Sequence, residues 1–147
     1  MKKLILLLSI VLLVSCSKSD DDSPKSLPLT YQNLAGKWNF KTVIRANGTE
    51  VPFVGRCSTQ IDYIEAFSYG KIVTYNFYPD CVTADDNGCS SYTYTTDNKI
   101  LASSFLFGDA TVTNLTANGF RIEYDTPQSL SFMININDAK AIVFEKR

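Results

Sequence analysis

Cysteine is the residue type in this 147-residue chain with the most distinctive chemistry, because the chain contains four cysteines and no histidine. Without an imidazole, neither Ser-His-Asp nor Cys-His catalysis can operate, and the commonest zinc ligand is missing. Cys57, Cys81 and Cys89 are too widely spaced for a Cys-x-x-Cys site. Residues 85–88 carry calcium-type side chains, but these are consecutive and no glutamate closes the loop. We therefore expect no enzymatic activity, no metal and no cofactor.

A short turn places two of these cysteines opposite each other. Residues 58–67 and 71–78 alternate as two strands around Gly70, and a three-residue hairpin loop takes a left-handed residue at its third position. Extending this register brings Cys57 opposite Cys81. Opposed residues have Cβ atoms about 4.5–5.5 Å apart, close to the separation that a disulfide needs. We predict a Cys57–Cys81 disulfide, which leaves the domain's third cysteine as the odd thiol.

The same hairpin has one face that is mostly aromatic and aliphatic and one that is polar. Glu65 and Lys71 lie diagonally on the apolar face, where they either pair at one end of the fold or orient a polar ligand group. Aromatic residues recur at strand spacing in several segments, and we expect most of them in the core. The candidate ligand-binding residues are Phe40, Tyr63, Tyr75, Phe105, Tyr124, Glu65 and Lys71.

The elements that must position these residues are short strands. Regular alternation separated by turn residues predicts an all-β fold, and local hairpins favour an antiparallel up-and-down β-barrel of eight to nine strands. An immunoglobulin-like β-sandwich is the alternative fold. A helical turn within residues 29–36, capped by Thr30, precedes the first strand; residues 79–88 are expected to form a loop, and Pro127 to interrupt pairing. The expected strands are residues 37–45, 58–67, 71–78, 91–95, 99–107, 110–115, 120–124, 130–136 and 141–146.

The N-terminal residues resemble a bacterial lipoprotein signal. A basic start precedes an apolar run too short to cross about 30 Å of hydrocarbon, and the run ends in Leu-Val-Ser-Cys at residues 13–16. The resemblance to a lipobox implies cleavage after residue 15 and a lipid anchor, such as palmitate, on Cys16. Residues 16–30 read as a flexible tether, because they are too polar to order themselves. Their acidic run also resembles the signal that directs lipoproteins of the Bacteroidota to the cell surface.

The start of the first predicted strand resembles a second family. Gly36-Lys37-Trp38 follows the helical turn and is similar to the Gly-x-Trp motif of lipocalins and related calycins. This resemblance covers residues 31–147. It implies a barrel whose tryptophan plugs one end and is covered by a basic residue of the last strand, Arg147 or Lys146. Unlike true lipocalins, the chain has neither a C-terminal helix nor a clear Thr-Asp-Tyr segment.

Together these patterns favour a lipocalin-like lipoprotein on the bacterial outer membrane, at the cell surface or the periplasmic face. After signal removal the net charge is about −3, which excludes the basic stripe expected of a nucleic-acid-binding protein. A barrel of about eight strands is either filled by side chains or holds one small ligand. We expect a small, mainly apolar or aromatic ligand. The alternative is a non-enzymatic interaction module with a filled barrel that contacts a protein or glycan through its loops.

Overall fold

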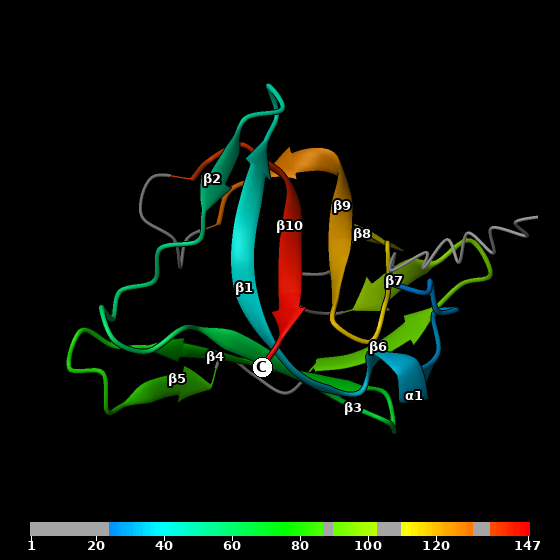
Figure 1. The fold of residues 1–147 in the computed structure, drawn as a ribbon, viewed down its shortest axis with the longest axis horizontal. Coiled ribbons are helices and arrows are strands. Elements are labelled where there is room, and N and C mark those ends of the chain that lie inside the picture. The colour runs from blue at the N-terminus through cyan, green and yellow to red at the C-terminus, as the bar shows by residue number, and fades with distance from the viewer. Residues whose placement is uncertain (1–23, 87–89, 103–109, 131–135) are drawn as a thin grey trace, which may run out of the picture.

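A computed structural model of the chain describes residues 24–86, 90–102, 110–130 and 136–147. One short helix and ten strands occur in these residues, and Figure 1 labels them in chain order. They are α1 (Tyr31–Leu34), β1 (Gly36–Arg45), β2 (Glu50–Pro52), β3 (Tyr63–Phe67), β4 (Lys71–Phe77), β5 (Ala84–Asp86), β6 (Ser90–Tyr94), β7 (Lys99–Ala102), β8 (Ala110–Thr113), β9 (Gly119–Gln128) and β10 (Ala139–Lys146).

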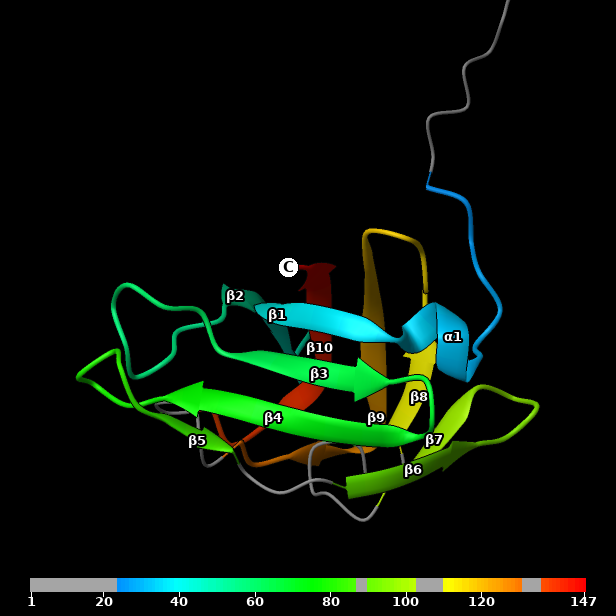
Figure 2. The ribbon, with the colours of Figure 1, turned by 90° about the horizontal axis from the view of Figure 1, so that it is seen from below.

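Eight of the strands form a closed antiparallel barrel. Their order is β1-β3-β4-β6-β7-β8-β9-β10, and β10 pairs with β1 to close the sheet. The two short strands β2 and β5 extend the edges of β1 and β4. Figures 1 and 2 show β1 and β10 side by side, with the β3–β4 hairpin crossing at one side of the barrel. The predicted all-β, antiparallel up-and-down barrel is confirmed. The pairing of β1 with β10 closes the sheet, whereas an immunoglobulin-like sandwich would consist of two separate sheets.

Alternate residues of each strand fill the interior, as the period of two requires. Strand β9, for example, buries Phe120, Ile122 and Tyr124 and leaves the residues between them partly exposed. Strand β10 buries Ile142 and Phe144 toward the same core. The core is therefore continuous around the barrel.

The predicted register of the β3–β4 hairpin is confirmed, but its predicted orientation is wrong. Tyr63 pairs with Tyr75 and Phe67 pairs with Lys71 around Gly70, which has a φ of 80°. The buried face, however, carries Ile64, Ala66, Ile72, Thr74 and Asn76, whereas the aromatic face is only half-buried on the outside. Alternation fixes which residues share a face, but it does not say which face is turned inward.

Other segments also differ from the expected strands. Residues 58–62 are not strand but the end of a loop, and the expected loop at 79–88 contains the short strand β5. Pro127 lies within β9 rather than ending it, next to an irregularity in the pairing with β10. Most of the expected strand at 130–136 lies outside the described residues.

The segment before α1 is part of the domain. Thr30 caps α1 as expected, with its hydroxyl oxygen accepting the Asn33 N–H at 3.1 Å. Leu29 is buried in the core, and the Leu27 N–H donates to Leu115 O at 2.7 Å. Contacts with the barrel therefore begin before residue 31.

Candidate functional site

Trp38 closes the end of the barrel next to α1. Its side chain is 1 % exposed, and its indole Nε1–H donates to Leu34 O at 2.8 Å. The Lys146 ammonium lies 3.9 Å from the ring centroid and donates to Ala35 O. Gly36 has a φ of 130°, and a side chain there would collide with the end of Lys146. These three contacts, and the lack of space for a side chain at Gly36, explain why glycine, tryptophan and a terminal-strand lysine occur together.

Arg147 was one of two residues predicted to cover Trp38, but its side chain packs on Tyr63 instead. Its guanidinium stacks 4.1 Å from the centroid of the Tyr63 ring and donates to Ile61 O at 3.3 Å. Strand alternation explains the difference, because consecutive residues of the last strand point to opposite faces. Lys146 therefore covers the indole, and Arg147 covers the outer face of β3.

A series of aromatic rings crosses the interior from this plug. Trp38 meets Phe120 edge-on at 5.1 Å between centroids, and Phe120 stacks on Phe144 at 4.7 Å. Phe144 contacts Phe40 at 4.9 Å, and Phe40 stacks on Phe53 at 4.6 Å. Phe53 belongs to the loop after β2, so the series begins at the closed end and reaches a loop at the barrel wall.

A pocket of about 400 Å³ lies within that loop. It is lined by Phe53, Val54, Gly55, Cys57, Ser58, Thr59, Gln60 and Ile61. Val54 and Ile61 are large apolar side chains that are at least half exposed to solvent. Figure 2 shows this loop and β5 at the end of the β3–β4 hairpin that is remote from α1. We call this region the mouth.

Two polar side chains are completely buried beside the mouth. Asp62 and Asn76 are both 0 % exposed, and extending the β3–β4 register by one residue places them opposite each other. Asp62 Oδ1 accepts the Phe77 N–H at 2.8 Å, whereas Asp62 Oδ2 and both polar atoms of the Asn76 amide have no hydrogen-bond partner among the described residues. Buried polar groups without partners are costly and few in native proteins. We call Asp62 and Asn76 the buried polar pair.

The electrostatic environment of Asp62 is dominated by its burial. Desolvation raises the pKa of the carboxyl above its ordinary value, while the Phe77 N–H and the charge of Arg56 oppose that rise. Arg56 lies at the mouth, with its guanidinium 4.7 Å from the centroid of the Tyr78 ring. A buried carboxyl with one backbone donor retains capacity to accept further hydrogen bonds.

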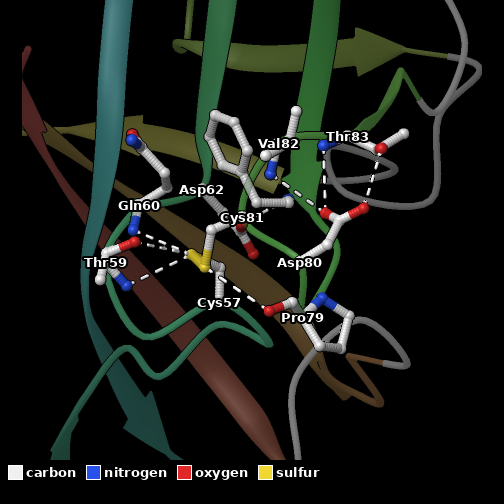
Figure 3. The surroundings of a disulfide bond; sticks show 10 residues. Cys57, Thr59, Gln60, Asp62, Pro79, Asp80, Cys81, Val82 and Thr83 are labelled. Carbon is white, nitrogen blue, oxygen red and sulfur yellow. Dashed lines mark hydrogen bonds between the residues drawn. A yellow bond between two sulfur atoms is a disulfide. The ribbon is translucent and has the colours of Figure 1, made fainter.

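The predicted disulfide between Cys57 and Cys81 is confirmed and holds the mouth together. Cys57 Sγ accepts the backbone N–H groups of Thr59 at 3.2 Å and Gln60 at 3.0 Å. Figure 3 shows these contacts together with Asp62. On the other side, the Asp80 carboxylate accepts N–H bonds from Val82 and Thr83 and so shapes the turn around Cys81. The disulfide therefore joins the pocket loop to the turn after β4.

The predicted ligand-binding residues do not form one cluster. Phe40 and Tyr124 lie in the core. Tyr63 and Tyr75 stack on each other at 4.5 Å between centroids on the outer face of the hairpin. Phe105 lies outside the described residues, as do Cys16 and Cys89.

Glu65 and Lys71 are not partners either. The Glu65 carboxylate lies 3.7 Å from the Lys37 ammonium on the outer surface, and Lys71 is exposed at the start of β4. Both residues face away from the barrel interior because the whole hairpin has the opposite orientation to the one expected. Neither orients a group inside the barrel.

The residues that sequence reasoning missed are Asp62, Asn76 and Gly55. Asp62 and Asn76 belong to the polar face of the hairpin, from which no site residue was predicted. One signal was available: a polar face that also carries Ile64, Ala66 and Ile72 has enough apolar residues to be buried. Gly55 gave no such signal, because its role depends on a contact with Asp62.

The part of the chain that the structure describes contains no group of three or more histidine, cysteine, aspartate or glutamate side chains arranged to hold a metal ion. No helix among those residues has the length and apolar character needed to cross a membrane.

Comparison with known proteins identifies no relative. No family model, curated protein or solved structure matches the chain.

Proposed function

We propose that this chain is a membrane-anchored, lipocalin-like lipoprotein that binds a small, mainly apolar or aromatic ligand at the mouth of its barrel. The observation that carries the proposal is a pocket of about 400 Å³ with an apolar rim, next to a fully buried polar pair that lacks partners. Small-molecule sites combine an apolar lining with a few polar groups that fix the ligand's orientation. The plug at Trp38 closes the barrel next to α1, and the mouth lies at the end of the β3–β4 hairpin that is remote from α1.

The size of the mouth and its chemistry support this choice. Pockets that bury small organic molecules have volumes of about 300–1,000 Å³. Phe53 offers an aromatic surface at the pocket and is itself backed by Phe40 of the core. A ligand ring at this position would extend the aromatic series that begins at Trp38.

Ligand retention is expected to depend on the rim of the pocket. Ile61→Arg should deplete a co-purifying apolar small molecule by at least tenfold, because it puts a charge where the ligand's apolar body would lie. Leu101→Arg is the matched control, since Leu101 is 47 % exposed and Ile61 is 50 % exposed, but Leu101 lies on β7. Mass spectrometry of molecules released from the purified proteins measures the effect. Equal retention by both variants would contradict binding at the mouth.

The membrane anchor is tested separately. Cys16→Ser should move the protein from the membrane fraction to the soluble fraction, because it removes the only thiol in the lipobox-like segment. Two acyl chains anchor a protein stably, whereas an unlipidated tether as polar as residues 17–26 does not. Fractionation and intact-mass measurement detect the change. An acylated Cys16→Ser product would rule out this residue as the anchor.

The alternative function, contact with a protein or glycan partner through the loops, is favoured by one observation. Val82 is 85 % exposed directly after Cys81, so an apolar side chain projects from the turn that the disulfide ties to the mouth. Exposed apolar residues gathered at one place commonly mark binding surfaces. In that case Val82→Ser should abolish partner capture without changing small-molecule retention.

A further inference from the structure

We infer that the ligand is an apolar molecule with an N–H donor head group, an amine or amide, and that Asp62 accepts this donor beneath the pocket loop. The inference rests on the proposed function and specifies its ligand. It begins from the acceptors of the buried polar pair. Asp62 Oδ2 and Asn76 Oδ1 are both buried acceptor oxygens without a partner among the described residues.

The unpartnered atoms of the buried polar pair are two acceptor oxygens and one donor, Asn76 Nδ2, so the pair lacks donors more than it lacks acceptors. An ionised carboxylate accepts hydrogen bonds only, and hydrogen bonds from a cationic donor to a carboxylate are about twice as strong as neutral ones. A ligand carboxylate at this place would instead bring a second negative charge next to Asp62 in a poorly solvated site. The chemistry of the pair therefore selects an N–H group over an anion.

Gly55 connects the buried pair to the pocket. It lines the pocket, and a Cβ built at this residue would lie 3.0 Å from Asp62 Oδ2 and 3.4 Å from Oδ1. The absence of a side chain at residue 55 thus leaves the carboxyl separated from the pocket by bare backbone. Any side chain here would be pressed against the carboxyl.

The loop that covers Asp62 is held at few points. The Phe53 N–H donates to Lys41 O at 2.9 Å, and Asp62 O accepts the Phe40 N–H at 3.2 Å. Between them, residues 54–61 make no backbone–backbone hydrogen bond to another described residue; the disulfide ties them to the turn after β4, and the Arg147 guanidinium donates to Ile61 O. Because Asp62 is completely buried, a head group reaches it when this segment moves outward, with the apolar body against Phe53.

The test uses three probes with the same apolar body: 2-phenylethylamine, ethylbenzene and phenylacetate. Binding to the full-length protein is followed by calorimetry and by amide shifts of Gly55 and Phe77. We expect the amine to bind at least tenfold more tightly than ethylbenzene and phenylacetate, which is the effect of one charge-assisted hydrogen bond. Asp62→Asn should remove most of this preference, and Gly55→Ala should weaken amine binding by at least fivefold. Ser91→Ala, at an exposed position of β6 outside the pocket, is the control and should bind like the unsubstituted protein.

The outcomes separate the two claims. If phenylacetate or ethylbenzene binds as tightly as the amine, or if Gly55→Ala leaves amine binding unchanged, the pocket stands and the assigned head group is wrong. If none of the three probes binds the unsubstituted protein, the proposed function fails together with the inference. Gly55→Ala keeps the test decisive if Asp62→Asn does not fold, because Gly55 lies outside the strands and has no positive φ.

Discussion

Trp38→Ala is expected to lower the free energy of unfolding by about 3–5 kcal/mol, as truncations of large aromatic residues in cores do. The substitution removes a side chain that is 1 % exposed, its hydrogen bond to Leu34 O and its edge contact with Phe120. It also leaves Lys146 without the ring that it covers. Urea denaturation measures the loss.

Tyr69→Ala provides the matched control for this prediction. Tyr69 is also aromatic but is 66 % exposed at the hairpin tip, so its truncation should change stability by no more than about 0.5 kcal/mol. Because Trp38 is the chain's only tryptophan, its emission should be blue-shifted and poorly quenched by acrylamide. A red, fully quenched emission, or equal losses in the two variants, would contradict a plug at this end.

The second large effect is expected from the disulfide. Cys57→Ser/Cys81→Ser should cost about 3 kcal/mol, because the bond closes a loop between residues 24 positions apart and so restricts the unfolded chain. Equilibrium unfolding in urea measures this cost, and non-reducing peptide mapping should recover the Cys57–Cys81 pair. The variant should also bind ligand more weakly, since the pocket loop then loses its tie to the turn after β4.

Cys89→Ser serves as the control for the disulfide. It replaces the third cysteine of the domain and should leave the unfolding midpoint unchanged. If it destabilises the protein as much as the double variant does, the thiol at residue 89 takes part in the pairing in solution. A dominant peptide that contains Cys89 would lead to the same conclusion.

Local signals in the sequence predicted the connectivity of the fold well. Gly70 indicated the register of the hairpin, and that register alone predicted that Cys57 lies opposite Cys81. Turn residues and period-two alternation similarly predicted successive antiparallel strands. These features depend on neighbours in sequence or on one hairpin, and so they can be derived from short segments.

The candidate site could not be predicted in this way, because it depends on which face of the hairpin is inside. The interior near Trp38 is already occupied by large rings from β1, β9 and β10, so the facing hairpin contributes the smaller Ile64, Ala66 and Ile72. The tyrosines of the hairpin pack outside, where Arg147 covers Tyr63. Only the packing of the whole barrel decides between these orientations. That decision places Asp62 and Asn76 inside.

The pairing of β1 with β10 also has a consequence for the timing of folding. Trp38 pairs with Lys146 and Arg45 pairs with Ala139, so the closing contacts join residues about one hundred positions apart. Such high contact order slows folding, because closing a long loop lowers the entropy of the chain before the new contacts can stabilise it. Until the last strand is available, β1 and β9 both present open edges. For a chain that we propose to be exported, this delay would keep it unfolded during translocation and restrict barrel closure to the far side of the membrane.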